Sequence, residues 1–189
     1  YEFFSIFVLI NQRNMEQKAL RKILWEEAGK AGLALGAVSS AYLFLAKFAG
    51  TIKMPALLSM LVTTILWAGK FGGCIWVMMF FMKRFCAENP EADNKNTRRL
   101  GIMMAFLSAL VFSAFSLADI AFISPDFYTD QIDQAMQTAA PMLDSNSLAE
   151  VESIMNRLPQ ITFFSNLIYC FVYGSILAAI LSRYIPSND

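Results

Sequence analysis

The sequence predicts an all-α, polytopic membrane protein with four transmembrane helices and a short helical extracytoplasmic insertion between helices three and four. Of its 189 residues, 57% are hydrophobic and only 16% are charged, whereas soluble domains carry about 45–50% apolar and about 25% charged residues. Four apolar runs are each long enough to cross the roughly 30 Å of a bilayer's hydrocarbon core as a helix. A soluble four-helix bundle is disfavoured, because each of its helices would show a polar face.

Residues 1–27 precede the first apolar run, and we expect them to form an N-terminal cytoplasmic segment. The first ten residues, YEFFSIFVLI, are rich in apolar side chains but too few to span a bilayer as a helix. A more conventional start follows at Met15. We therefore expect residues 1–14 to be either translated upstream sequence or a truncated extension.

The membrane domain is predicted over residues 28–184, followed by a short C-terminal tail at 185–189. Its apolar runs cover residues 28–48, 54–82, 100–124 and 161–184. Gly50 and Pro55 separate the first two runs, since both residue types interrupt helices. The polar segment 83–99, which contains Pro90, separates the second run from the third.

Residues 125–160 form the long outer loop, in which we expect two short amphipathic helices. Ser124 followed by Pro125 and Asp126 is a helix-start pattern, and Pro141 ends that helix. A capping-box signature at Ser147 and Glu150 starts the second helix, which Pro159 closes. The apolar stripes are Tyr128, Ile132, Ala135, Met136 and Ala139, and then Leu148, Val151, Ile154, Met155 and Leu158.

The charge and packing of this loop limit its roles. It holds six acidic residues and one basic residue, which argues against binding anionic lipid head groups. Its apolar faces could rest on the bundle as an ordinary connector, which we favour. Alternatively, they could form a partner surface or cover a cavity.

The distribution of Lys and Arg predicts the orientation. Eleven of these residues lie on the side of the N-terminus, the 83–99 segment and the C-terminus, and three lie on the other side. Since cytoplasmic loops carry the excess of positive charge, both termini are predicted to be cytoplasmic. The eleven are Arg13, Lys18, Arg21, Lys22, Lys30, Lys83, Arg84, Lys95, Arg98, Arg99 and Arg183, and the three are Lys47, Lys53 and Arg157.

Polar residues inside the apolar runs are the candidate functional residues, because intramembrane charge is costly and usually functional. Lys47, Asp119 and Asn166 each fall about one turn from the outer end of helices one, three and four. They are predicted to form one polar layer. This layer is either a structural clasp between the helices, which we favour, or a proton or substrate site.

Lys70 is the other candidate. Its position along the second run lies about 16 Å deeper than that of Asp119, so we do not expect a direct bridge between the two. Ser108 and Tyr173 lie near its depth and could accept hydrogen bonds. The simpler expectation is that Lys70 snorkels towards the inner interface near Trp76.

Other chemistry is sparse, and the sequence predicts no catalytic residue, cofactor site or metal site, and no enzyme activity. Histidine is absent, which removes the commonest general base and metal ligand. The three cysteines show no CxxC spacing. The formal net charge is zero, so nucleic-acid binding through bulk positive charge is disfavoured.

Two GxxxG patterns predict close helix packing. They are Gly32 with Gly36 in the first run and Gly69 with Gly73 in the second. Small residues at this spacing let two backbones approach each other. We expect this packing within the bundle, with packing across a dimer as the alternative.

Several sequence features together are typical of one known family. They are the start EEAGKAGLALGAVS, the second helix WAGKFGGCIWVMMFFMKRF, the third helix GIMMAFLSALVFSAF and the exit at Pro125–Asp126–Phe127. From about Met15 to Tyr184, the chain resembles the four-helix membrane family of Bacteroidetes catalogued as domain of unknown function 4199. The resemblance implies a bacterial cytoplasmic-membrane protein and carries no functional residues.

Two functions follow from these observations as hypotheses. The first is a small accessory or scaffold protein that acts through helix packing and its outer loop. The second is a subunit of an oligomeric transporter or channel that uses Lys70 or the layer of Lys47, Asp119 and Asn166. The predicted partners are the lipid bilayer and either another membrane protein or a second copy of the chain.

Overall fold

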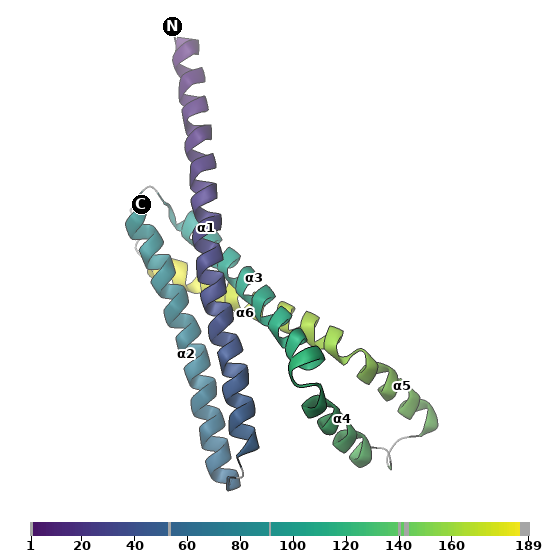
Figure 1. Ribbon diagram of the computed structural model, residues 1–189. Coiled ribbons are helices and arrows are strands. Elements are labelled where there is room, and N and C mark those ends of the chain that lie inside the picture. Colours follow the sequence, from purple (N-terminus) through teal and green to yellow (C-terminus); the bar gives the residue numbers. More distant parts are fainter. Residues whose placement is uncertain (1, 53, 91, 140, 142–143, 186–189) are drawn as a thin grey trace.

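The computed structural model describes residues 2–52, 54–90, 92–139, 141 and 144–185. Side chains are described from Lys18 onward, apart from the same gaps and residues 139, 145–146, 148–149 and 152. All regular structure in these segments is helical (Figure 1). The elements are α1 (Glu2–Thr51), α2 (Ala56–Glu88), α3 (Asn94–Ala118), the π-helix η1 (Asp119–Ile123), α4 (Pro125–Ala139), α5 (Ser145–Asn156) and α6 (Leu158–Tyr184).

Four segments are long and apolar enough to cross a membrane, which confirms the predicted fold class. They are Lys18–Thr51 of α1, Ala56–Glu88, Asn94–Ile123 and Leu158–Tyr184. The shortest has 27 residues, which at 1.5 Å per residue amounts to about 40 Å, more than the hydrocarbon core requires. The chain is therefore a multi-pass membrane protein. Short helices lie between the third and fourth spans, as predicted.

The spans form two helical pairs that diverge from one end of the molecule (Figure 1). α1 and α2 run antiparallel as a hairpin, while α3 and α6 form the second pair. α1 also packs along α3 and so joins the two pairs. The ends of the pairs near α4 lie well apart, and α4 and α5 lie beyond the diverging end of α3 and α6.

Glycines produce the closest helix contacts, as expected for packing within the bundle. A Cβ atom on Gly32 would lie 2.6 Å from Leu107 Cβ of α3, and one on Gly36 would lie 2.6 Å from Val111 Cγ1. The first GxxxG pattern therefore packs α1 against α3. At Gly69 of α2, by contrast, a Cβ atom would meet no neighbouring helix or side chain within 4 Å. This glycine faces open space, so the close packing predicted for the second GxxxG pattern is wrong at Gly69.

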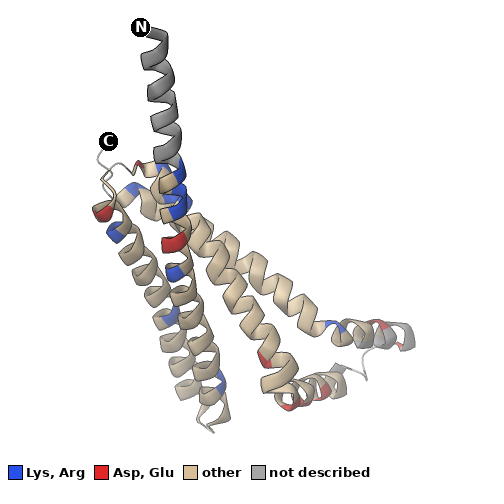
Figure 2. Cartoon of the chain, turned by 45° about the horizontal axis from the view of Figure 1, so that its top comes forward, with Lys and Arg blue, Asp and Glu red and all other residues tan. Residues whose placement is uncertain are grey.

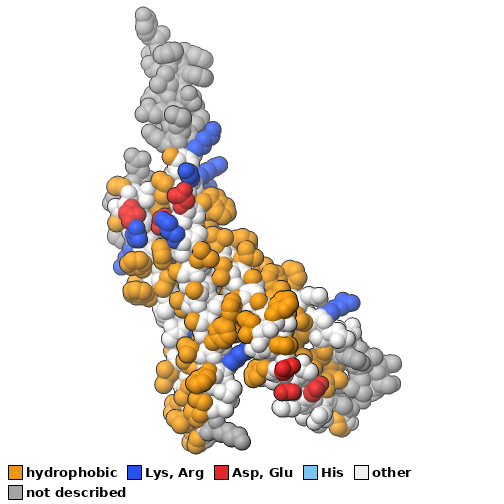
Figure 3. Space-filling view, viewed as in Figure 1, with side chains coloured by type: hydrophobic (Ala, Val, Ile, Leu, Met, Phe, Trp, Pro, Cys, Tyr) orange, Lys and Arg blue, Asp and Glu red, His pale blue; other side chains and the backbone are white. Residues whose placement is uncertain are grey.

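The buried core and the exposed apolar side chains occupy different parts of the molecule. The core is centred on the end where the pairs converge, around Ala28, Met82, Leu100 and Ala178. Large apolar side chains elsewhere face outward, such as Leu57, which is 81% exposed. Figure 3 shows hydrophobic side chains covering the middle of the molecule, with charged ones towards its two ends. This distribution fits a lipid-facing surface.

Basic residues gather at the converging end of the bundle (Figure 2). This end holds the first described side chains of α1, the end of α2, the start of α3 and the end of α6. Acidic residues are prominent on α4 at the opposite end. The fold therefore gathers at one end the basic residues that the sequence assigns to one side of the membrane.

The polar segment predicted at 83–99 is mostly helical. α2 continues to Glu88 and α3 begins at Asn94, so only a short connection remains. Asp93 caps α3, because its carboxylate accepts a hydrogen bond from the backbone N–H of Asn96 at 2.7 Å. The predicted boundaries of the second and third runs mark where the apolar residues end. The helices themselves continue into the polar residues, up to their capping residues.

Two details of the outer helices differ from the prediction. The N-cap of α5 is Asp144, whose carboxylate accepts from the backbone N–H of Ser147 at 2.9 Å, so the predicted capping box is wrong. Hydrogen bonding by Ser147, first through its side chain and then through its backbone N–H, lowers the pKa of Asp144. Pro159 lies in the first turn of α6, where its missing N–H costs nothing, so it belongs to the start of that helix.

Candidate functional site

The third span ends in a π-helix, which begins at the candidate functional residue Asp119. The backbone N–H of Ser124 donates to the Asp119 carbonyl at 2.8 Å, which is the i→i+5 bond of a π-helix. In a π-helix the hydrogen-bonded turn contains one residue more than in an α-helix, and such turns occur frequently at functional sites. Here η1 connects directly to α4, which begins at Pro125.

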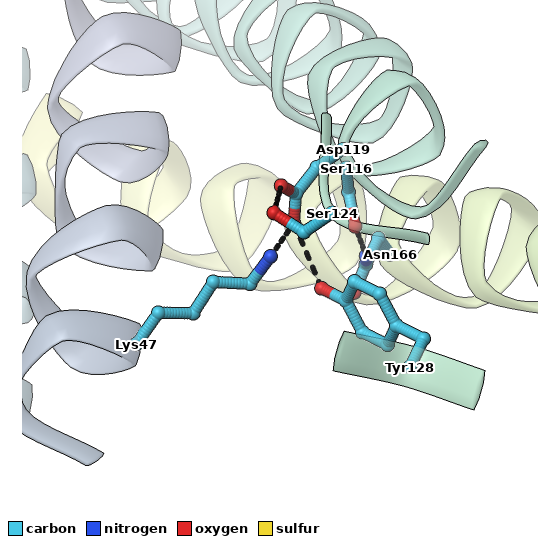
Figure 4. A network of polar contacts seen from close by, with 6 residues as sticks. All are labelled: Lys47, Ser116, Asp119, Ser124, Tyr128 and Asn166. Carbon is cyan, nitrogen blue, oxygen red and sulfur yellow. Dashed lines mark hydrogen bonds and ion pairs between the residues drawn. The ribbon is translucent and has the colours of Figure 1, made fainter. Parts of the chain in front are cut away.

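The carboxylate of Asp119 is fully buried, with 0% side-chain exposure, and three side chains donate to it (Figure 4). Lys47 Nζ of α1 forms an ion pair with Oδ2. The hydroxyl of Tyr128, from α4, donates to Oδ2 at 2.8 Å. Ser124 Oγ donates to Oδ1 at 3.3 Å. A buried carboxylate requires such partners, because its desolvation costs several kcal/mol.

Tyr128 contacts both members of the ion pair. Its hydroxyl binds Asp119, while Lys47 Nζ lies 4.5 Å from the centre of its ring. Burial, and then the hydrogen bond to the carboxylate, raise the pKa of Tyr128 above its ordinary value. The side chain of Lys47 is 18% exposed, whereas that of Asp119 is fully buried. Only the lysine of this ion pair therefore reaches the surface of the bundle.

Asn166 of α6 makes a separate hydrogen bond beside this pair. Its Nδ2 donates to Ser116 Oγ at 3.1 Å, and Ser116 precedes Asp119 on α3 by three residues, which places both on one helix face. The structure thus brings Lys47 to Asp119 and places Asn166 next to them through Ser116. We call the six residues drawn in Figure 4 the polar clasp: Lys47, Ser116, Asp119, Ser124, Tyr128 and Asn166.

Lys70 lies against aromatic rings instead of snorkelling towards Trp76. Its Nζ is 5.0 Å from the ring centre of Tyr42 on α1 and 5.0 Å from that of Phe112 on α3. The snorkelling expectation is therefore wrong: rings from two other helices lie around the ammonium inside the bundle. Among the residues that the structure describes, Lys70 has no carboxylate within ion-pair distance.

Two cavities meet the side chain of Lys70. The larger, about 460 Å³, lies between α1, α2, α3 and α4. The smaller, about 60 Å³, lies between the four spans, and Ser108 and Tyr173, which the sequence places at the depth of Lys70, line it. The larger cavity is lined by Tyr42, Leu43, Ala46, Lys47, Gly50, Lys70, Phe112, Phe127, Tyr128 and Gln131.

Sequence reasoning missed several partners in this region. The sequence indicates Tyr128 only as the first member of an apolar stripe, and Ser124 only as a helix start. Both follow Asp119 within nine residues, at the end of the predicted third span, and this position was the available signal. Tyr42 and Phe112 gave none, because they lie on different helices and meet Lys70 only through the tertiary fold.

This geometry separates two chemical roles. In the polar clasp, the carboxylate and its donors satisfy one another, which ties α1, α3 and α4 together. At Lys70, an ammonium borders two cavities without a counter-ion among the described residues. The described part of the chain also contains no group of three His, Cys, Asp or Glu residues placed to hold a metal ion.

A comparison with protein families identifies the family of this chain. Residues 30–183, most of the chain, match the family described as "Protein of unknown function (DUF4199)". The chain therefore belongs to the DUF4199 family. Searches of curated proteins and of solved structures found no match.

Proposed function

We propose that this member of the DUF4199 family is a non-catalytic accessory protein of a bacterial cytoplasmic membrane, with both termini in the cytoplasm. In this proposal it presents α4 and α5 on the outer face as a binding element for another membrane protein. The observation that carries the proposal is the buried Asp119, which receives donors from α1, from the end of η1 and from α4. The clasp fixes the start of the outer insertion to the bundle.

The use of the polar groups supports a structural role over a catalytic one. A general base needs an accessible lone pair and a position next to substrate. Asp119 is fully buried and accepts from three side chains, so its acceptor capacity is largely used within the protein. The same bonds hold α4 in one position, which a binding element requires.

The outer helices also keep apolar side chains available for a partner. On α5, Ile154 is 49% exposed, although it belongs to the predicted apolar stripe. Phe127 at the start of α4 is 37% exposed. The expectation that both stripes rest on the bundle therefore fails for Ile154, and the exposed side chains favour the partner-surface alternative.

Affinity purification in mild detergent tests this role. We expect the wild-type chain to co-purify with a membrane protein, and Ile154→Asp to lose that protein while still inserting as a monodisperse species. Lys83→Met, at an exposed position on the opposite end, serves as the matched control and should retain the partner. Equal recovery with Ile154→Asp, or recovery of no membrane protein with the wild type, would contradict the proposal.

The second candidate, a subunit of an oligomeric transporter or channel, is favoured by one observation. The 460 Å³ cavity reaches both Lys47 and Lys70, so a path for a charged substrate would have side chains to meet. In a variant without native cysteines, Leu43→Cys would report on water in this cavity. Labelling by a membrane-impermeant thiol reagent supports transport, whereas full protection, with Thr138→Cys on α4 labelled as control, excludes it.

A further inference from the structure

The charged side chains on the cavity walls are all positive. Among the residues that line the two cavities, Lys47 and Lys70 are the charged ones, and both are cationic. Lys47 is neutralised by Asp119. Lys70 therefore contributes a net positive charge inside the membrane-spanning part of the protein, where an uncompensated charge is costly.

Aromatic rings compensate this charge only in part. The faces of Tyr42 and Phe112 lie 5.0 Å from Lys70 Nζ and that of Phe71 lies 6.0 Å away. Cation–π contacts are weaker than a charge-assisted hydrogen bond to an anionic oxygen. An anion that reached the cavity would consequently find an ammonium held in place by rings and without a competing carboxylate among the described residues.

The cavity walls further restrict what that anion can be. The larger cavity, at about 460 Å³, has the size of ordinary small-molecule sites, about 300–1,000 Å³. Beside the two lysines, its polar side chains are Tyr42, Tyr128 and Gln131, and the rest of its lining is apolar or glycine. Such a lining matches a mostly apolar molecule with one anionic group.

The position of the site favours a membrane-borne ligand. Lys70 follows the start of α2 by 14 residues, about 21 Å along the helix. A hydrophilic anion would lose its hydration to reach that depth, whereas an amphiphile enters with its tail in an apolar environment. A single tail with a one-charge head suits one ammonium better than a phospholipid does, whose head group stays at the interface.

We infer that the cavities beside Lys70 bind a single-tailed anionic amphiphile, a long-chain carboxylate, with its head group on Lys70 Nζ and its tail along Leu43, Ala46 and Phe112. Phe127 of α4 borders this site, whereas Ile154 of α5, which the partner test uses, is not part of its lining. The assignment does not depend on the proposed accessory role. It gives Lys70 a function that the polar clasp does not provide.

Native mass spectrometry of the full-length chain in neutral detergent tests the assignment, with oleate as the probe. The wild type should retain one oleate per chain, and Lys70→Met should lower the affinity about tenfold or more, since the charge-assisted bond is lost. Lys70→Arg should keep binding, because it keeps the charge. Lys83→Met, an exposed lysine of the same helix, is the matched control and should bind as the wild type does.

Ligand controls make the test independent of how the variants fold. Oleyl alcohol has the same tail without the charge, so it should bind the wild type as weakly as oleate binds Lys70→Met. Inorganic phosphate in excess should not displace oleate. Equal binding of oleate and oleyl alcohol, unchanged oleate binding in a folded Lys70→Met, or displacement by inorganic phosphate would each overturn the assignment.

Discussion

At the scale of single residues, Asp119 is the most consequential side chain in the described structure. Its carboxylate is fully buried, and the chain supplies it with an ammonium and two hydroxyl groups from sites before and after it in the sequence. Buried ion pairs contribute little net stability relative to apolar residues, but breaking one of them leaves an uncompensated charge. The polar clasp should therefore respond very differently to single and to paired substitutions.

A double-mutant cycle on Lys47 and Asp119 measures this difference. We expect Asp119→Leu alone to lower the free energy of unfolding by about 3 kcal/mol, because Lys47 loses its counter-ion. Lys47→Met combined with Asp119→Leu should recover most of that loss, since both charges disappear together. Unfolding in mixed micelles with increasing denaturing detergent gives the values. Strictly additive effects would show that the two residues are not coupled.

The environment of Tyr128 leads us to expect that the folded protein loses stability at alkaline pH. The pKa of Tyr128 is raised in the folded state by burial and by Asp119, so the folded protein holds the phenolic proton more tightly than the unfolded chain does. The resulting stabilisation is fully present below the unfolded pKa of about 10 and is lost as the pH rises above it. Thermal unfolding scans from pH 8 to about pH 11 should show this decline.

Tyr128→Phe serves as the control for that decline. It removes the titrating hydroxyl but keeps the ring beside Lys47. The variant should be less stable than the wild type at neutral pH and should lose less stability between pH 9 and about pH 11. If wild type and variant decline in parallel, the alkaline loss originates in other groups.

At the scale of elements, α1 and α3 depend on glycine for their contact. A Cβ atom at Gly36 would lie 2.6 and 2.7 Å from two atoms of Val111, a β-branched side chain with little rotamer freedom. Gly36→Ala should therefore destabilise the bundle by about 1–3 kcal/mol. Gly69→Ala is the matched control, because nothing lies within 4 Å of its Cβ position. It should be neutral or slightly stabilising in the same unfolding assay.

Individual elements also show how far the sequence could predict this structure. The four spans were predictable, because length and apolarity are local properties of each run. The π-helix was not predictable in this way. It begins at Asp119, and the side chain of Asp119 is bound by Lys47, which lies 72 positions away in the sequence. The pairing of Lys47 with Asp119 followed from helix counting, because both residues lie near the same ends of their spans.

The surroundings of Lys70 could not be predicted for a related reason. The residue's depth followed from its position in the second run, but its direction depends on how α1 and α3 pack. That packing places the rings of Tyr42 and Phe112 against the ammonium. Snorkelling is the usual outcome for a lysine facing lipid, whereas this lysine faces the interior.

At the scale of the whole molecule, the separation between the helical pairs connects the two proposed roles. The pairs converge where the core is buried and diverge towards α4, and the larger cavity lies on the diverging side, with Phe127 and Tyr128 on its wall. Tyr128 therefore belongs both to the polar clasp and to the cavity. A ligand at Lys70 would lie next to the group that holds α4 in place.

Orientation is a property of the whole chain, and it yields the last prediction. Eleven Lys and Arg residues belong to one side and three to the other, so the converging end is expected in the cytoplasm. Neutralising both Arg98 and Arg99 would leave nine against three and should not invert the protein.

In a variant without native cysteines, Thr138→Cys should react with an impermeant thiol reagent on intact cells. Lys95→Cys should react only after the membrane is permeabilised. The opposite pattern would place α4 and α5 in the cytoplasm and remove the outer face from the proposed partner surface.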